Sequence, residues 1–164
     1  MLSFRSHTEN YKYLCIKIIN NLHNNMKHRG CKVDFAEERT RELMRVFRDT
    51  IALREFIDIG EVSRAVVNTP CSRFWISEER ALRVVNAIMK GFPILYGMRP
   101  SKREMFKEIY RRVTKMLREC PGMSVYRCVI KVVNSPAPKF YMTPGSAMTM
   151  IYKTRKEGKL SSAS

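Results

Sequence analysis

Residues that interrupt helices are scarce in this sequence, which has only seven glycines and seven prolines among 164 residues. Strong helix formers such as Leu, Met, Arg, Lys and Glu fill most of its length instead. Apolar residues make up 45% of the chain, which is enough to bury a core and excludes global disorder. We therefore expect an all-α fold in the form of a compact helical bundle.

Cysteine pairs are also missing from the sequence. The five cysteines are odd in number and no two form a Cys-x-x-Cys pair, which argues against a disulfide framework or a zinc knuckle. They are Cys15, Cys31, Cys71, Cys120 and Cys128. We interpret them as reduced thiols, most of them packed in the interior.

Motifs for catalysis, metal binding or cofactor binding are missing as well. The only histidines are His7, His23 and His28, and no cysteine or carboxylate stands near them at the spacing of a metal site or catalytic triad. The sequence has no phosphate-binding glycine loop, no Gly-x-Ser-x-Gly and no His-Glu-x-x-His. We therefore expect a non-enzymatic protein with no cofactor and no metal.

Long apolar runs do not occur. No segment approaches the ~20 apolar residues that cross a bilayer. The amino-terminal segment is broken by Glu9, Lys12 and Lys17, so it lacks the apolar core of a signal peptide. We expect no membrane partner and a cytoplasmic location in a bacterial-type or host cell, with virion association as the alternative.

Acidic residues are few, with 15 Asp and Glu against 31 Lys and Arg, so the formal net charge is +16. Residues 1–98 carry 16 basic and 11 acidic side chains (+5), whereas residues 99–164 carry 15 and 4 (+11). Such an excess repels itself unless an anionic partner compensates it. The charge predicts DNA or RNA as the partner, or an acidic protein.

The chain contains an internal repeat. Residues 66–77 read VVNTPCSRFWIS, and residues 132–143 read VVNSPAPKFYMT. Five of these twelve positions are identical and five more pair chemically alike residues, which indicates a duplication. We place the two repeat units at about 51–90 and 123–156, within one helical domain of residues 1–152 that is followed by a basic, flexible tail of residues 153–164.

Each repeat unit is expected to form a helix, an extended loop and a second helix. A proline stops the first helix, and Asn68 and Asn134 terminate it by hydrogen bonds from side chain to backbone. Ser77 and Thr143 are the expected N-caps of the second helix. Pro144 then occupies the first helical position, where its missing amide costs nothing.

Apolar periodicity predicts three further helices. The first spans residues 10–28 and ends at Gly30. The second begins with Asp34 as its cap, buries Phe35, Leu43, Val46 and Phe47, and turns Glu38 and Glu42 to water. Residues 51–68, which begin the first repeat unit, are expected to be helical as well, with an interruption at Gly60. The third spans residues 102–119 after Ser101 and buries Met105, Ile109, Val113 and Met116.

A ridge of five cations follows the helix over residues 102–119 at steps of three and four residues. They are Arg103, Lys107, Arg111, Lys115 and Arg118. With no carboxylate on the ridge, it is suited to contact phosphates. The alternative is an ordinary solvated face, in which Glu108 pairs with neighbouring basic side chains such as Arg112.

The two loops each place a cation beside two aromatic residues, a combination that can bind a phosphate and stack on a base. These are Arg73-Phe74-Trp75 and Lys139-Phe140-Tyr141. Because neighbouring side chains of an extended segment point in opposite directions, we expect Phe74 and Phe140 to anchor the loops in the core. The candidate ligand contacts are then Arg73, Trp75, Lys139 and Tyr141, together with Lys153, Arg155 and Lys156 of the tail.

The two Pro-x-x-basic-Phe-aromatic segments, each followed by a capped helix, resemble segments of small, basic, uncharacterised helical proteins of bacterial phages and mobile elements. The resemblance covers residues 51–156. No activity is assigned to that family, so the resemblance implies a genetic-element context and favours association with nucleic acid or with a virion.

Two functions remain open at this point. The first is non-enzymatic binding of DNA or RNA with weak sequence preference. At one helix start Glu78 and Glu79 oppose phosphates, and at the other Pro144 and Gly145 offer no side chain that reads bases. The second is a protein-interaction or virion structural component that uses the duplicated units as docking surfaces. A continuous positive face favours the first, and an exposed apolar patch favours the second.

Overall fold

The computed structural model describes residues 35–161, and it describes their side chains as far as residue 157. The chain divides into two units, residues 1–32 and 33–164, and every described helix belongs to the second unit. The helix expected over residues 10–28, with its end at Gly30, lies outside the described residues. The same holds for the histidines, for two of the cysteines and for the cap expected at Asp34.

The described residues form six α-helices and no strand, which confirms the all-α prediction. The helices are α2 (Ala36–Ala52), α3 (Ile59–Asn68), α4 (Glu78–Met89), α5 (Pro100–Glu119), α6 (Val125–Val133) and α7 (Pro144–Ser161). None of them is long and apolar enough to span a bilayer.

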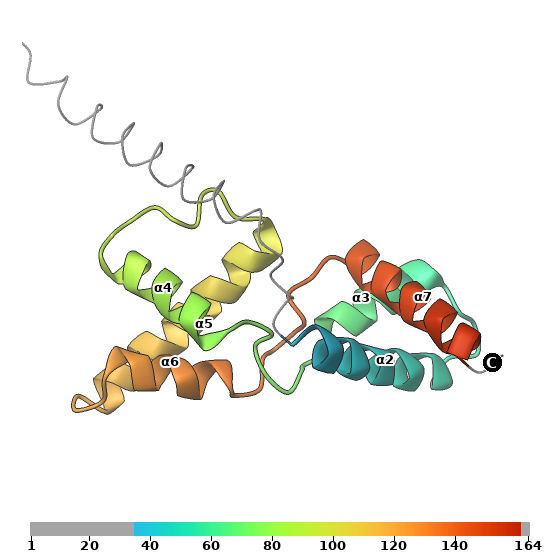
Figure 1. The fold of residues 1–164 in the computed structure, drawn as a ribbon, viewed down its shortest axis with the longest axis horizontal. Coiled ribbons are helices and arrows are strands. Elements are labelled where there is room, and N and C mark those ends of the chain that lie inside the picture. The colour runs from blue at the N-terminus through green and yellow to red at the C-terminus, as the bar shows by residue number, and fades with distance from the viewer. Residues whose placement is uncertain (1–34, 162–164) are drawn as a thin grey trace, which may run out of the picture. The chain divides into compact units, whose positions relative to one another are not determined.

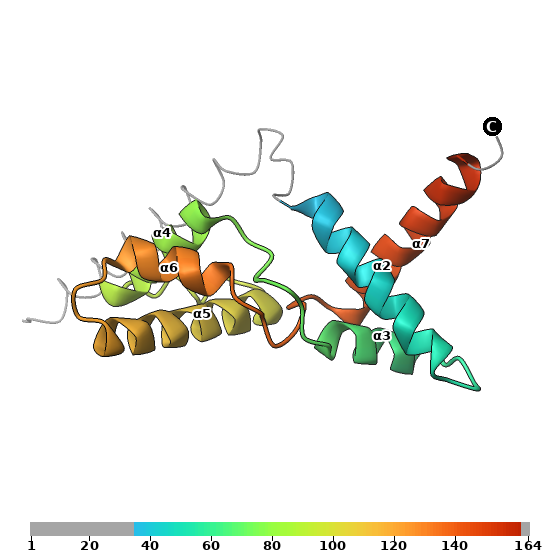
Figure 2. The ribbon, with the colours of Figure 1, turned by 90° about the horizontal axis from the view of Figure 1, so that it is seen from below.

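The helices pack in two groups of three (Figures 1 and 2). Helices α4, α5 and α6 contact one another, and so do α2 and α3 with α7. As a result, the first helix of each repeat unit packs on the second helix of the other unit, α3 on α7 and α6 on α4. The two repeat units therefore complete each other's hydrophobic contacts.

The buried residues follow the helical periodicity of the sequence. Leu43, Val46 and Phe47 of α2 are buried, as are the expected Met105, Ile109 and Val113 of α5, whereas Met116 is half-buried. The matched positions of the two units are also equivalent in burial, since Ala81 and Ala147 are both fully buried, and so are Val85 and Ile151. Burial of apolar area at these positions is the main source of stability.

The two interhelical loops pair with each other through backbone hydrogen bonds. The amide of Cys71 donates to the carbonyl of Ala137 over 3.0 Å, and the amide of Ala137 donates back over 2.9 Å. The amide of Phe74 donates to the carbonyl of Val133, and that of Phe140 donates to the carbonyl of Val67, both over 3.0 Å. Each partner differs from its counterpart by 66 positions, so the hydrogen bonds of the two loops match at that shift.

The start of α2 differs from the expectation. The helix begins at Ala36, and its cap position is Phe35, which has a left-handed backbone (φ 61°) and makes no side-chain capping bond. Phe35 is half-buried rather than buried, because it packs against the ring of Trp75 instead of entering the core. Glu38 is exposed as expected, but Glu42 is not.

Glu42 fixes the start of the first loop. Its carboxylate accepts hydrogen bonds from the amide of Ser72 (2.8 Å) and from the hydroxyl of Ser72 (3.0 Å). Its side chain is only 10% exposed. The prediction that Glu42 faces water is therefore wrong, because the loop folds over this side of α2 and supplies two donors.

The helical segment expected over residues 51–68 is interrupted before Gly60 and not at it. Helix α2 ends at Ala52, and α3 begins after Asp58, whose carboxylate accepts a hydrogen bond from the amide of Glu61 over 3.0 Å. Gly60 lies inside α3, where an added Cβ would come within 3.1 Å of that carboxylate. The glycine thus makes room for the capping side chain.

The ends of the repeat helices agree largely with the sequence. The side-chain amide of Asn68 donates to the carbonyl of Arg64, and that of Asn134 donates to the carbonyl of Ile130, as expected. Thr143 accepts a hydrogen bond from an amide of the first turn of α7, whereas Ser77 occupies the cap position without such a bond. Helix α5 begins two residues earlier than expected, at Pro100 rather than Lys102.

The carboxyl-terminal helix is longer than the sequence suggests. Helix α7 continues through Lys153 to Ser161, so the chain does not leave the helix at the expected boundary of the tail. The side chains of Arg155 and Lys156 are exposed, and Lys153 forms a long ion pair of 3.8 Å with Glu157. The segment thus carries exposed cations on a helix.

Candidate functional site

The ridge of cations on α5 does not form a free positive surface. The guanidinium of Arg103 donates to three backbone carbonyls of the preceding loop, those of Leu95, Tyr96 and Met98, over 3.2–3.3 Å. Arg103 is therefore occupied in holding the α4–α5 connection in place. This role was not visible in the sequence, because it depends on how the loop folds back on the helix.

Two other members of the ridge have acidic partners. Arg111 donates to both carboxylate oxygens of Glu108, over 2.7 and 2.8 Å, and Lys115 pairs with Glu119 at 3.7 Å. No carboxylate stands on the ridge itself, but glutamates beside it pair with two of its members, because side chains three and four residues apart meet on a helix surface; this is the alternative of an ordinary helix face with neighbouring ion pairs. Lys107 and Arg118 are exposed and form no ion pair with a described residue.

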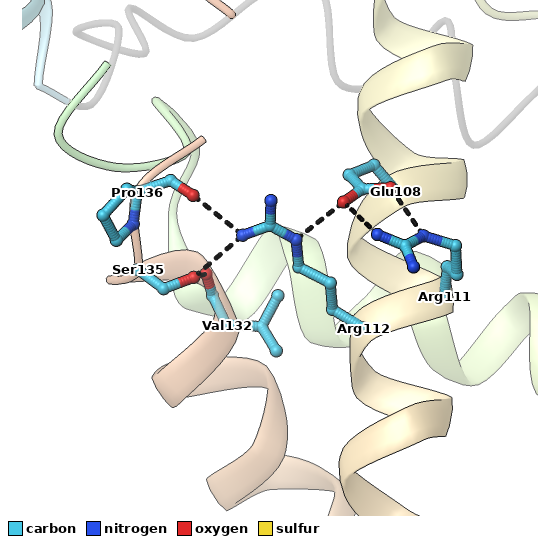
Figure 3. A network of polar contacts seen from close by, with 6 residues as sticks. All are labelled: Glu108, Arg111, Arg112, Val132, Ser135 and Pro136. Atoms are coloured by element: carbon cyan, nitrogen blue, oxygen red, sulfur yellow. Dashed lines mark hydrogen bonds and ion pairs between the residues drawn. The ribbon is translucent and has the colours of Figure 1, made fainter. Parts of the chain in front are cut away.

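Glu108 also joins α5 to the second loop (Figure 3). It accepts a hydrogen bond from Arg112 over 2.7 Å, as expected, and Arg112 reaches on to the carbonyl of Pro136 (2.8 Å) and the hydroxyl of Ser135 (3.3 Å). Hydrogen bonding from Arg111 is the main cause that lowers the pKa of Glu108 to about 2. The network fixes the start of the loop against α5.

The aromatic residues of the loops lie largely as predicted. Phe74 is fully buried and Phe140 is 4% exposed, which confirms both as core anchors. Arg112 lies over the ring of Phe74, with 5.1 Å between the guanidinium carbon and the ring centroid. The ring of Tyr141 stacks on Phe74 with centroids 5.9 Å apart. Each loop is therefore held to the core by its phenylalanine.

The remaining loop candidates are engaged in contacts within the protein. The guanidinium of Arg73 lies 4.0 Å from the centroid of Phe35, and its Nε donates to the carbonyl of Phe74. Lys139 pairs with Glu104 at 2.6 Å. Trp75 and Tyr141 are half-buried, and burial is the main cause that raises the pKa of Tyr141 to about 12. These residues support the loops, and only part of each side chain reaches the surface.

Sequence reasoning missed a cluster of four cations. Arg39 lies in the first turn of α2, Arg80 in the first turn of α4, Arg99 at the cap position of α5, and Lys102 in its first turn. Burial lowers the pKa of Lys102, and the charges of Arg80, Arg99 and Arg39 lower it further, so each of these three side chains lies near Lys102. We call this set the four-cation cluster.

No member of the four-cation cluster forms an ion pair within the described part of the chain. The nearby carboxylates of α4 are engaged elsewhere, since Glu78 accepts a hydrogen bond from Asn134 and Glu79 pairs with Arg83. Arg39 has a buried Nε without a hydrogen-bond partner among the described residues, and burial lowers its pKa. The cluster therefore presents positive charge that the described residues leave uncompensated.

A pocket of about 370 Å³ lies beside this cluster and shares Arg99 with it. It is formed by the end of α3, the start of α5 and the segment that leads into α7. Its walls are Val67, Asn68, Arg99, Pro100, Ser101, Glu104, Lys139, Tyr141, Met142, Thr143 and Pro144. The pocket therefore brings both matched segments, Val67–Asn68 and Lys139–Thr143, together with the start of α5.

Residues for metal binding or thiol chemistry do not gather in the described part of the chain. No group of three or more His, Cys, Asp or Glu side chains is suited to hold a metal ion there. Cys71 and Cys128 are buried free thiols, as expected, whereas Cys120 is exposed. Burial, and secondarily the charge of Glu42, raises the pKa of Cys71 to about 12, so this thiol stays protonated.

The fold and the site together define an all-α protein whose described residues leave positive charge uncompensated beside a pocket. No family model, no curated protein and no solved structure matches the chain.

Proposed function

We propose that the protein binds DNA or RNA without catalysis, through the four-cation cluster. The observation that carries the proposal is the placement of Arg99 and Lys102 at the amino end of α5, which has no acidic residue in its first turn. Cations are unfavourable at this end, because the helix dipole is positive there. An anionic ligand offsets this cost, and phosphate is the anion suited to a cluster of Arg and Lys.

The charge of the whole chain supports the same proposal. A net charge of +16 attracts a polyanion and raises the rate of association. Exposed cations outside the cluster, such as Lys107, Arg118, Arg155 and Lys156, add positive charge elsewhere on the surface. Sequence preference is expected to be weak, because α7 begins with Pro144 and Gly145 and offers no side chain that reads base edges.

The test is a salt titration of binding to a labelled duplex of about 20 base pairs, followed by fluorescence anisotropy. Each phosphate contact contributes about −0.9 to the slope of log K against log salt. Reversing Arg80, Arg99 and Lys102 together to Glu is expected to weaken binding and flatten that slope by about two to three units.

The matched control reverses three other exposed cations, Lys90, Arg127 and Lys131, and so makes the same change in net charge. The control is expected to weaken binding less than the cluster variant and to flatten the slope by under about one unit. If nuclease-treated wild-type protein binds neither duplex nor single strands of DNA and RNA at about 50 mM salt, the proposal is wrong.

A second function is favoured by one specific observation, an exposed apolar surface at the α2–α3 connection. Leu53 is 88% exposed, Phe56 90%, Ile57 56% and Ile59 41%. Neighbouring exposed apolar side chains mark contact sites for other proteins. If this surface rather than the cluster serves the function, a protein partner stays bound after nuclease treatment and is lost in a Leu53→Asp, Phe56→Asp variant. A role in a phage or mobile element fits either function.

A further inference from the structure

The pocket beside the four-cation cluster has the size and lining of a nucleotide site. Its volume of about 370 Å³ lies in the range of small-molecule pockets. Apolar and aromatic side chains form much of its wall, namely Val67, Pro100, Tyr141, Met142 and Pro144. Such a surface stabilises the faces of a base, because stacking and apolar contact do not depend on base identity.

Polar groups of the pocket suit the other parts of a nucleotide. Arg99 and Lys139 supply positive charge to the pocket, and Arg99 is also a member of the four-cation cluster outside it. Asn68 and Glu104 add hydrogen-bonding groups within the same pocket. Glu104 holds Lys139 by an ion pair of 2.6 Å, so Arg99 is the cation of the pocket that has no ion pair with a described residue. Phosphate is therefore best placed on the Arg99 side.

The backbone at Tyr141 is held in an unusual conformation. Its φ of 50° is in the left-handed region, which is unfavourable for a bulky aromatic residue. The stacking on Phe74 and the cation of Lys139, 5.6 Å from the ring centroid, hold the ring in this position. The strained residue thus forms one wall of the pocket.

We infer that this pocket takes one unstacked nucleotide of a single strand, with the base against Tyr141 and the apolar wall and the adjoining phosphates on Arg99 and Lys102. The inference rests on the proposed function and deepens it, since it names single-stranded nucleic acid as the preferred ligand. Bases of a duplex are stacked and paired, so they cannot enter a pocket without being extruded. A duplex is left with the phosphate contacts alone.

The experiment compares three labelled probes with equal phosphate counts at one salt concentration. They are a single-stranded oligothymidylate of about 12 nucleotides, an abasic strand of the same length, and a duplex that carries the same number of phosphates. Wild-type protein is expected to bind the thymidine strand at least about tenfold more tightly than the abasic strand. Equal affinity for these two strands overturns the inference.

A pocket-filling variant, Ser101→Leu, provides the second measurement. Ser101 lines the pocket, and the substitution adds volume without a change in charge. The matched control is Thr114→Leu on the same helix, outside the pocket. Ser101→Leu is expected to lose about tenfold in affinity for the thymidine strand and to bind the duplex as the wild type does, while the control changes neither. Equal losses for strand and duplex, or no loss, overturn the inference.

The two proposals fail in distinguishable ways. If wild-type protein binds none of the three probes at about 50 mM salt, and binds no duplex or single strand of RNA either, the proposed function itself is wrong. If it binds the duplex and the abasic strand as well as the thymidine strand, nucleic-acid binding stands and the pocket has no part in it. The comparison of probes needs no variant, so it decides the matter even if Ser101→Leu does not fold.

Discussion

Cys71 and Ala137 lie opposite each other and exchange two backbone hydrogen bonds, which join the loops of the two repeat units. The thiol of Cys71 adds two longer contacts, to the carbonyl of Arg73 at 3.3 Å and to the carbonyl of Lys139 at 3.4 Å. The end of α3, which precedes the first loop, and the second loop both line the pocket at the start of α5. The pairing of the loops therefore supports the walls of the pocket.

The first prediction concerns the loop anchors. Phe74→Ala and Phe140→Ala are each expected to lower the free energy of unfolding by about 3–5 kcal/mol, because both rings are buried and their removal leaves a cavity. Chemical denaturation followed by circular dichroism measures the change. The control is Phe56→Ala, at a ring that is 90% exposed, with an expected change under about 0.5 kcal/mol. A loss below about 1 kcal/mol at both loop positions would show that they are not anchors.

The second prediction concerns Glu42. Glu42→Ala removes the acceptor of two hydrogen bonds from Ser72 and is expected to destabilise the protein by about 1–3 kcal/mol. Glu38→Ala, at an exposed position of the same helix, serves as the control and should change stability by less than about 0.5 kcal/mol. Thermal and urea unfolding compare the two variants. Equal stabilities of the Glu42→Ala and Glu38→Ala variants would mean that water replaces the Glu42 carboxylate at no cost in stability.

The third prediction concerns pH. The pKa of Glu108 lies at about 2, below its ordinary value of 4.5, mainly because Arg111 donates hydrogen bonds to it. A lowered pKa stabilises the folded state above pH 4.5, and this stabilisation is lost as the pH falls towards 2. Arg111 is 67% exposed, so solvent screens its ion pair with Glu108. We therefore expect the pair to contribute only about 1–2 kcal/mol to the free energy of unfolding.

The measurement compares wild type with Glu108→Gln by urea unfolding from pH 7 down to about pH 3. The wild type is expected to be the more stable at pH 7, and the difference should shrink below pH 4.5. Glu79→Gln, in an exposed pair with Arg83, is the control and should show little difference at any pH. A difference in the free energy of unfolding between wild type and Glu108→Gln that stays constant with pH would contradict the lowered pKa of Glu108.

The fourth prediction concerns the cysteines. Burial raises the pKa of Cys71 to about 12, so its reactive thiolate is nearly absent near pH 8, and Cys128 is also buried. In a variant with Cys15 and Cys31 changed to Ser, a thiol reagent is expected to label Cys120 rapidly and the other two only on unfolding. Mass spectrometry of timed samples measures this. Rapid labelling of Cys71 in the folded protein would show that the paired loops open.

The fifth prediction separates Arg103 from its neighbour Lys107. Arg103→Glu removes three hydrogen bonds to loop carbonyls and is expected to lower stability by about 2 kcal/mol or more. Lys107→Glu, at an exposed side chain with no described partner, should leave stability within about 0.5 kcal/mol and weaken nucleic-acid binding modestly. If Arg103→Glu alters binding without any loss of stability, the ridge is a binding surface as the sequence predicts.

The sequence by itself determined the helical class and much of the core. Few glycines and prolines and a regular apolar period suffice for this, because helix formation and burial of one face depend on local spacing. The repeated segment also gave the two anchors, Phe74 and Phe140, and the asparagines that end the first helices. That the two segments arose by duplication stays a prediction, although their hydrogen bonds match at a shift of 66 positions.

Only the tertiary structure decided which charges are free. Spacing along α5 placed Arg103 and Arg111 on one ridge, but a loop carbonyl or a carboxylate three residues away satisfies each of them. The four-cation cluster joins Arg39, Arg80 and the pair Arg99 and Lys102, which are far apart in the chain. Coulombic interaction depends on distance in space, and no periodicity of the sequence encodes the approach of three different helix ends.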